Sequence, residues 1–228
     1  MGKMSALLFT SGTTGTAKGV MLSHKNLTAA ANASVLSMSY DMNNTFVSIL
    51  PPHHSYEITC GEMAIQMLGA EILINDSLKH IMKNFAWYKP NALMLVPLIV
   101  ETMHKKIWDE VKKRKMEKKL KFAMGLSNFL LFFGIDKRQK LFAQVTGAFG
   151  GNLKSIVCGG APLSPQIIKD FYAFGITVLE GYGITECAPL VAVNSPGKVK
   201  FHSVGQPVKG CRVRIDKQDE SDETGEIC

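Results

Sequence analysis

The residues with the clearest chemical potential lie from Thr10 to Gly19, where the sequence is TSGTTGTAKG. Three glycines, five hydroxyl side chains and one lysine occupy these ten positions. Glycines let the backbone approach a phosphate closely, hydroxyls donate hydrogen bonds to phosphoryl oxygens, and Lys18 adds a mobile positive charge. The segment is not a Walker A motif, because Ala17 precedes the lysine and Gly19 follows it. It predicts a phosphate-binding loop, and an ordinary flexible turn stays open as the alternative.

A second group of chemically capable residues runs from Glu180 to Glu186, with the sequence EGYGITE. The face of Tyr182 can stack on a nucleotide base, and the Thr185 hydroxyl can reach a phosphate oxygen. Glu186 can hold Mg²⁺, a cation that prefers carboxylate and phosphate oxygens. The same residues also suit a tight turn with a core tyrosine and an exposed glutamate, so this alternative stays open.

Two further loops complete the set of candidates. The segment from Gly159 to Leu163 is a turn of small residues that leaves room for a planar ligand, or merely for the chain. The paired histidines His53 and His54 follow an apolar run that ends at Leu50. Because adjacent histidines rarely chelate one metal ion, a histidine that lines a polar pocket is preferred over a zinc ligand.

The elements that must position these loops alternate between strand and helix. The periodicity predicts strands over residues 6–9, 46–50, 71–74, 93–96, 155–158 and 176–179, and helices over 58–68 and 78–87. Ser23 is expected to cap a further helix, and Ser164 with Pro165 starts another that Gly175 ends. Repeated strand–loop–helix units predict an α/β fold, with mainly parallel sheets covered by helices on both faces.

The fold prediction also places the candidate loops. In parallel α/β sheets, ligands bind at the carboxyl ends of the strands. The loops that begin at Thr10, Gly159 and Glu180 each follow directly on a predicted strand. After about Val193 the sequence changes to short strands and turns, which predicts that a β-rich subdomain begins there.

The amino-acid composition of the chain excludes several classes of protein. The chain has 228 residues, 46% hydrophobic and 20% charged, which is enough for a packed core. Its uncharged apolar stretches are too short to span a bilayer as a helix. Five cysteines without a C-x-x-C pair favour a reducing, cytoplasmic location over a disulfide framework or a zinc knuckle.

The positive charge is concentrated in one segment. Formal net charge is +7, and residues 105–121 alone hold nine Lys or Arg against three acidic residues. A nucleic-acid groove would interleave its basic residues with aromatics, so no nucleic-acid partner is expected. The apolar residues that follow extend the segment to residue 133. Residues 105–133 suit peripheral contact with an anionic membrane, such as the inner membrane surface, and a solvated helix followed by a buried one is the alternative.

Five segments, in this order along the chain, carry a family resemblance: residues 9–23, 50–57, 159–165, 179–186 and 203–207. They resemble the motifs of the adenylate-forming (AMP-dependent synthetase/ligase) superfamily, and most of all those of bacterial long-chain fatty acid–CoA ligases. The resemblance extends over essentially the whole chain and implies the fold of an acyl-CoA synthetase N-terminal domain.

The resemblance also implies a role for individual residues. The loop around the β- and γ-phosphates of ATP is matched by Thr10, Ser11, Gly12, Thr13, Thr14, Gly15 and Lys18. The remaining nucleotide positions are matched by Gly160, Ala161, Pro162, Tyr182, Gly183 and Thr185. Glu186 matches the Mg²⁺ ligand, and His54 and Gly181 match positions on the acyl side. Lys18, Thr185 and Glu186 are the residues expected to act in catalysis.

The implied reaction has two steps, with ATP, Mg²⁺ and coenzyme A as cofactors and co-substrates. A fatty acid is activated as its acyl-adenylate, and coenzyme A then displaces AMP. A non-catalytic nucleotide-binding module and an adenylation enzyme for another carboxylic acid are the alternatives. Residues 1–193 are expected to be the central part of the N-terminal domain and residues 194–228 the start of the β-rich subdomain. The N-terminal lead segment and the lysine-bearing C-terminal domain of the family are expected to be absent.

Overall fold

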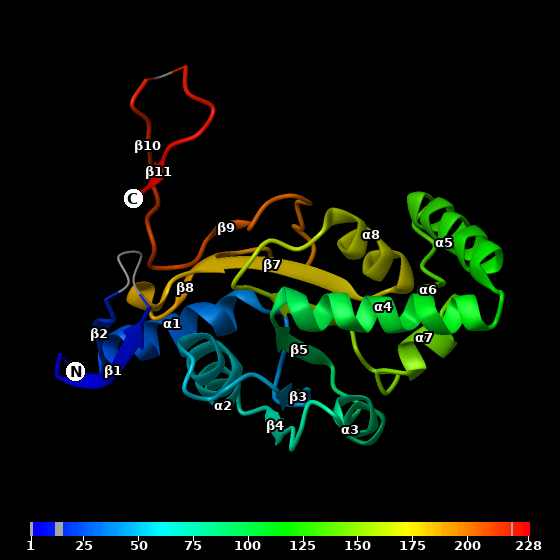
Figure 1. Ribbon diagram of the computed structural model, residues 1–228, viewed down its shortest axis with the longest axis horizontal. Coiled ribbons are helices and arrows are strands. Elements are labelled where there is room, and N and C mark those ends of the chain that lie inside the picture. The colour runs from blue at the N-terminus through cyan, green and yellow to red at the C-terminus, as the bar shows by residue number, and fades with distance from the viewer. Residues whose placement is uncertain (1, 12–15, 220) are drawn as a thin grey trace.

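A seven-stranded sheet runs through the computed structural model, which describes residues 2–11, 16–219 and 221–228. Its strand order is β4–β3–β5–β6–β7–β8–β9 (Figure 1). The strands are β3 (Thr45–Ser48), β4 (Glu71–Ile74), β5 (Ala92–Leu95), β6 (Ser155–Cys158), β7 (Thr177–Gly183), β8 (Leu190–Val193) and β9 (Gln206–Pro207). From β4 to β7 every pairing is parallel, whereas β7–β8 and β8–β9 are antiparallel. The predicted α/β fold with a mainly parallel sheet is confirmed.

Helices separate and cover these strands. They are α1 (His24–Ser37), the π-helix η1 (Glu57–Met63), α2 (Ala64–Leu68), α3 (Ile81–Tyr88), α4 (Pro97–Lys113), α5 (Glu117–Phe132), α6 (Arg138–Leu141), α7 (Ala143–Gly147), α8 (Pro165–Phe174) and the 3₁₀ helix η2 (Thr185–Cys187). Ser23 caps α1 as predicted, since its hydroxyl accepts from the Asn26 amide at 3.2 Å. Gly175 ends α8 in the left-handed conformation, with φ of 91°.

The core has two halves because successive strand residues point to opposite faces of the sheet. On one face, Leu93 and Ile156 pack with Phe85 of α3 and Phe171 of α8. The other face carries its own cluster, whose strand and helix members are Phe46, Ala92, Met94, Val157, Leu179, Val193, Ala33 of α1 and Ile65 of α2. Both faces are therefore covered by helices, which explains why the strands are apolar without clear alternation.

The first predicted strand does not join this sheet. β1 (Met4–Thr10) and β2 (Lys18–Ser23) form a separate antiparallel hairpin, in which Thr10 pairs with Lys18. Ala6 and Leu8 of one face, with Leu22, pack against α1. The expectation that the Thr10 loop lies at the carboxyl edge of the parallel sheet is therefore wrong. The loop connects the two strands of this hairpin, and the short connection lets β1 pair with its immediate neighbour.

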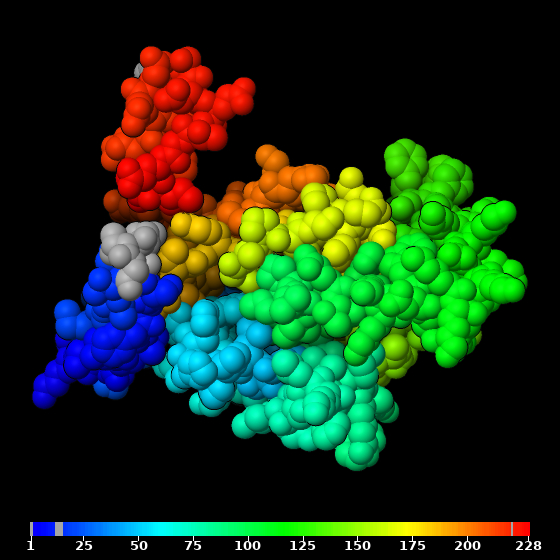
Figure 2. Space-filling model, viewed as in Figure 1, coloured from blue at the N-terminus to red at the C-terminus, as the bar shows by residue number. Residues whose placement is uncertain are grey.

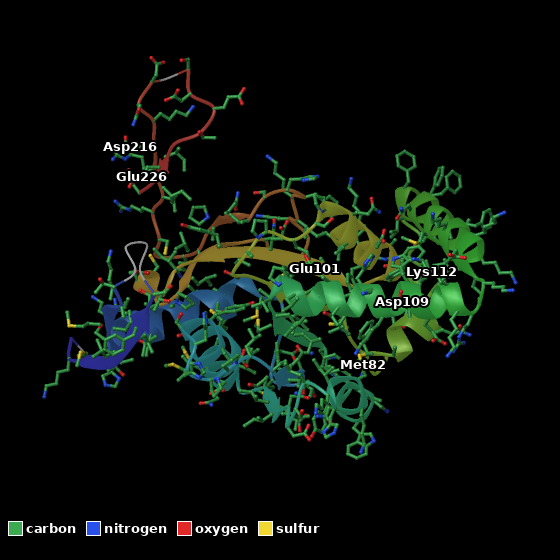
Figure 3. All side chains as sticks on the ribbon, in the orientation of Figure 1. Met82, Glu101, Asp109, Lys112, Asp216 and Glu226 are labelled. Atoms are coloured by element: carbon green, nitrogen blue, oxygen red, sulfur yellow. The ribbon has the colours of Figure 1, made fainter. Side chains whose placement is uncertain are left out.

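The last part of the chain lies partly on the sheet and partly away from it. β9 pairs with β8, so residues beyond 193 contribute a strand to the main sheet. β10 (Ile215–Asp216) and β11 (Glu226–Ile227) pair only with each other and form a projecting lobe (Figure 2). Figure 3 shows Asp216 and Glu226 on this lobe, away from the helices. The predicted boundary at residues 193 and 194 stays a prediction.

Candidate functional site

A cavity of about 500 Å³ lies at the carboxyl ends of the central parallel strands. This volume is in the range of about 300–1,000 Å³ that is typical of small-molecule sites. Segments that follow β3, β5 and β6, together with the end of β7, line it. The lining residues are His54, Ser55, Tyr56, Val96, Pro97, Leu98, Val157, Gly159, Gly160, Ala161, Gly181, Tyr182, Gly183, Ile184, Thr185, Pro189 and Leu190.

The wall after β3 is held by local and long-range hydrogen bonds. The His54 amide donates to the carbonyl of Pro51 at 3.0 Å, and the Tyr56 amide donates to Nδ1 of His54 at 3.2 Å. The Tyr56 hydroxyl donates to the carbonyl of Val157 at 3.1 Å, which ties this wall to β6. Burial raises the pKa of Tyr56 well above its ordinary value. Tyr56 is thus a neutral spacer under the cavity, with its ring beneath Gly159.

The wall that contains Tyr182 differs from the predicted loop. Glu180 to Gly183 belong to β7, which pairs first with β6 and then with β8. The strand continues because β8 supplies new hydrogen-bond partners where β6 ends. Only Ile184 to Glu186 leave the sheet, and η2 begins there at Thr185.

Thr185 and Ser55 come together from opposite walls. The Oγ atoms of the two side chains lie 3.4 Å apart, although 130 positions separate them in the sequence. Ser55 is buried and Thr185 is partly exposed. Two hydroxyls facing one cavity can both donate to a phosphoryl oxygen. Glu186 follows on η2 with an exposed side chain.

The hairpin that carries the Thr10–Gly19 segment lies beside η2. β2 contacts η2, and Ala188, just after η2, packs in the same apolar cluster as Leu22 of β2. The tertiary structure therefore places the β1–β2 hairpin, which carries the Thr10–Gly19 loop, next to the segment that carries Thr185 and Glu186. Gly12, Thr13, Thr14 and Gly15 of this loop lie outside the described residues.

Among the predicted site residues that the structure describes, seven line the cavity and five do not. The members that line it are His54, Gly160, Ala161, Gly181, Tyr182, Gly183 and Thr185. Among the predicted residues that the structure describes, Thr10, Ser11, Lys18, Pro162 and Glu186 do not line it. The first three are on the neighbouring hairpin, Pro162 follows the β6 turn, and Glu186 is on η2. Within residues 2–11, 16–219 and 221–228, no group of three metal-ligating side chains forms.

Sequence reasoning missed part of the lining. Val96, Pro97 and Leu98 follow β5, and Ser55 follows His54. Val96 to Leu98 carry no chemical signal, since all three are apolar or proline. Their position at the end of the predicted strand 93–96 and directly after it was the available signal, because β5 lies between β3 and β6 in the sheet.

A buried carboxylate lies close behind the cavity wall. Glu57 is fully buried, and its Oε1 accepts a hydrogen bond from the Ser48 hydroxyl at 2.5 Å. Its Oε2 has no hydrogen-bond partner among the described residues. Burial raises the pKa of Glu57 to about 7, and the charge of Glu62 adds to this shift, while the Ser48 hydrogen bond opposes it. Glu57 therefore sits near its titration point at neutral pH.

Two glycines of the cavity differ sharply in the space around them. A Cβ at Gly183 would overlap the carbonyl group of Pro189, whereas a Cβ at Gly159 would meet its neighbours at 3.6 Å, an ordinary contact. We expect Gly183→Ala to lower the free energy of unfolding by about 1–3 kcal/mol, because β7 and β8 must separate. Gly159→Ala is the matched control and should stay close to wild type. Urea denaturation measures both, and equal stability of the two variants would contradict the packing argument.

Comparison with known proteins supplies the family. The family model described as "AMP-binding enzyme" matches residues 2–228. The chain is 28% identical to long chain acyl-CoA synthetase 7, peroxisomal, of Arabidopsis thaliana, over 99% of this chain and 34% of that protein. It is 30% identical to long-chain-fatty-acid–CoA ligase 5 of Mus musculus, over 90% of this chain and 32% of that protein. The chain thus spans about a third of the length of these relatives.

A solved structure supports the same fold. The o-succinylbenzoate coenzyme A synthetase from Bacillus subtilis, in complex with AMP, superposes with a TM-score of 0.69 at 18% identity. The match covers 99% of this chain and 38% of that protein. The family model covers almost every residue, and the resemblance seen in the sequence is confirmed: the chain belongs to the AMP-binding enzyme family.

Proposed function

We propose that the protein containing this chain is an AMP-forming acid–thiol ligase that activates a fatty acid and transfers it to coenzyme A. The observation that carries the proposal is the single cavity that brings His54, Gly160, Tyr182 and Thr185 together. The β1–β2 hairpin, which carries the hydroxyl-rich Thr10–Gly19 loop, contacts η2, and η2 begins at Thr185. The names of the relatives, which include long-chain acyl-CoA synthetases, support a fatty acid as the substrate.

In the first step, a fatty carboxylate oxygen bonds to the α-phosphorus of ATP, and the bond to pyrophosphate breaks. The Tyr182 ring packs on adenine, with Gly160 and Ala161 beside the ribose. The hydroxyls of Thr185 and Ser55 donate to oxygens of the α-phosphate. These donors already face the cavity, so they stabilise the crowded anionic phosphorus without reorganising.

The β- and γ-phosphates are bound by the Thr10–Gly19 loop, with Lys18 neutralising the charge of the leaving pyrophosphate. Glu186 fits Mg²⁺, because this cation is commonly held by one or two carboxylates together with nucleotide phosphates. Its exposed carboxylate follows directly on Thr185, which faces the cavity. Mg²⁺, when bound, supplies positive charge to the phosphate oxygens.

In the second step, the coenzyme A thiolate attacks the acyl carbonyl carbon and AMP leaves with its phosphate oxygen. The site needs no side-chain nucleophile for either step. The chain positions the reactants, and the apolar residues Val96, Leu98 and Leu190 form part of the cavity wall around them. The reaction is proposed to take place in the cytoplasm.

The first test is calorimetric titration of this chain with hydrolysis-resistant acyl-adenylate analogues of short, medium and long chain. Each additional buried CH₂ contributes about 0.8 kcal/mol, so affinity should rise with chain length until the acyl site is filled. AMP alone is the control for the nucleotide half. Equal affinity for AMP and all analogues would contradict an acyl site within these residues.

A second measurement separates catalysis from binding alone. The full-length protein should exchange labelled pyrophosphate into ATP only when a carboxylic acid is present. Exchange with fatty acids, and not with aryl or amino acids, supports the proposed substrate class. Nucleotide binding without exchange would instead identify a non-catalytic nucleotide-binding module.

A further inference from the structure

The outer face of α5 exposes a line of large apolar side chains. We define this outer face by Phe122, Leu126, Phe129, Phe132 and Phe133, which are 74%, 38%, 61%, 84% and 61% exposed. Phe122, Leu126 and Phe129 are spaced four and three residues apart. This spacing aligns them on one side of the helix. Exposed apolar patches of this kind commonly mark interaction sites on proteins.

The orientation of α5 is fixed by its other side. Leu120, Ala123 and Met124 pack against the main core. Ser127 is buried, and its hydroxyl donates to the carbonyl of Ala173 in α8 at 3.3 Å. These contacts hold the inner side of α5 against α8, so the phenylalanine line must face outward. The sequence also allowed a solvated helix followed by a buried one. For these outward-facing residues that alternative is wrong.

The phenyl rings support one another at the end of the helix. The Phe133 ring lies 5.1 Å from the ring of Phe129 and 5.3 Å from the ring of Phe132, both in edge-on geometry. These three rings form one continuous exposed apolar surface. No helix among the described residues has the length and hydrophobicity to cross a bilayer.

Positive charge borders the same face. Lys118 and Lys119 lie four and three residues before Phe122, on the same side of α5, and Lys121 is also exposed. Arg114 is paired with Glu110 at 2.7 Å and Arg138 with Asp136 at 2.7 Å. In the part of the chain that the structure describes, no ion pair involves the three lysines. They are therefore available for anionic groups of a partner.

The outer face of α5 and the β1–β2 hairpin lie at opposite ends of the molecule. Figure 1 shows α5 at the end of the long axis opposite the β1–β2 hairpin. In Figure 2 the α5 region forms a projecting edge of the surface. Figure 3 shows Glu101, Asp109 and Lys112 along α4, with Lys112 toward the end that meets α5. A partner on the outer face would thus bind far from the β1–β2 hairpin.

We propose that the outer face of α5 binds the surface of an anionic phospholipid bilayer. The phenylalanines enter the boundary between headgroups and acyl chains, and Lys118, Lys119 and Lys121 contact the headgroup phosphates. An apolar line bordered by lysines matches an interface that is apolar inside and anionic outside. A neutral protein partner would leave the lysines without counter-charges, and a second copy that docks through the same face would set lysines against lysines. The proposal stands on this surface and does not depend on the proposed reaction.

The test is co-sedimentation of the chain with vesicles of phosphatidylcholine alone and of phosphatidylcholine with phosphatidylglycerol. We expect binding to the anionic vesicles, with a marked loss between about 0.1 M and about 1 M salt, where the screening length falls from about 10 Å to about 3 Å. The triple variant K118E/K119E/K121E should bind at least about 100-fold more weakly. The variant F129S/F132S/F133S should bind at least about tenfold more weakly.

Matched controls test whether these losses belong to the outer face. The variant K25E/K79E/K169E reverses three exposed lysines on other elements and should bind much more strongly than K118E/K119E/K121E. Ile74→Ser removes an apolar side chain that is 75% exposed on β4 and should bind like wild type. Circular dichroism should show the same fold for every variant. Equal binding by the outer-face variants and their controls would overturn the proposal.

Two further measurements test how deeply the outer face enters the bilayer and whether the partner is a bilayer or a second copy of this chain. Phe132→Trp should gain fluorescence quenching by lipids brominated on their acyl chains, beyond the background from Trp87 and Trp108, whereas Leu36→Trp on α1 should not. Equal quenching at both positions, or equal binding to neutral and anionic vesicles, would overturn the proposal. Loss of a wild-type dimer in F129S/F132S/F133S, with no vesicle binding by wild type, would identify a second copy as the partner and overturn it as well.

Discussion

Glu186→Gln should lower the rate of ATP–pyrophosphate exchange in the full-length protein by at least about 100-fold, because removing one group that stabilises transition-state charge typically costs this much. The carboxylate follows Thr185, whose hydroxyl lies 3.4 Å from that of Ser55 in the cavity. The amide keeps the size of the side chain and removes only the charge that fits Mg²⁺. The exchange rate measured as a function of Mg²⁺ concentration checks the prediction, and the half-saturating concentration should rise.

Because Glu186 is exposed, an effect of its substitution on the exchange rate can be separated from an effect on folding stability. The side chain is exposed, so its substitution should change the free energy of unfolding by no more than about 0.5 kcal/mol. Glu223→Gln, an exposed carboxylate near β11, is the matched control and should exchange at the wild-type rate. Lys18→Ala should lower the exchange rate less, by about tenfold to 100-fold, because hydroxyls and backbone amides still bind the phosphates. Wild-type exchange rates in both Glu186→Gln and Lys18→Ala would contradict the proposed site.

Glu57→Gln should remove a loss of stability that wild type suffers as the pH rises. The pKa of Glu57 in the folded chain is raised to about 7, from an ordinary value of 4.5. Between these values the folded chain keeps a proton that the unfolded chain releases. The free energy of unfolding of wild type therefore falls as the pH rises through this window. The shift corresponds to about 3 kcal/mol in total, and the loss is complete above the folded pKa.

Urea denaturation of both proteins at several pH values measures this effect. Relative to wild type, Glu57→Gln should gain stability steadily as the pH rises toward 7 and no further at higher pH. Gln keeps the size of the protonated carboxyl group, and its carbonyl oxygen can still accept the hydrogen bond from Ser48. Gly61 leaves space for the side chain at position 57, because a Cβ at Gly61 would lie 2.9 Å from the Glu57 carboxyl carbon. The exposed Glu226→Gln is the control, and parallel pH profiles for wild type and Glu57→Gln would refute the assignment.

Local features of this chain could be predicted because they depend on near neighbours. Ser23 caps α1 through Asn26, three residues away, and Gly175 ends α8 because glycine adopts positive φ without strain. Hydroxyls and glycines between Thr10 and Gly19 indicate phosphate chemistry through residue type alone. The parallel sheet was also predictable, since strands that alternate with helices pack in few ways.

Features that depend on distant parts of the chain could not be predicted from the sequence. Ala6 and Leu8 look the same whether β1 joins the parallel sheet or a hairpin, so the sequence did not reveal its partner. Glu180 to Gly183 continue as a strand only because β8 returns beside them. The wall formed by Val96 to Leu98 carries no chemical signature of its own.

The sequence by itself determined the family, the alternation of strands and helices, and several of the residues that line the cavity. Only the tertiary structure decided that Ser55 faces Thr185, that Glu57 is buried, and that the phenylalanines of α5 face outward. The physical reason is that caps and turns depend on short-range hydrogen bonds, which nearby residues specify. Burial depends on the non-directional hydrophobic effect, so an apolar side chain alone does not reveal whether it faces the core or the surface.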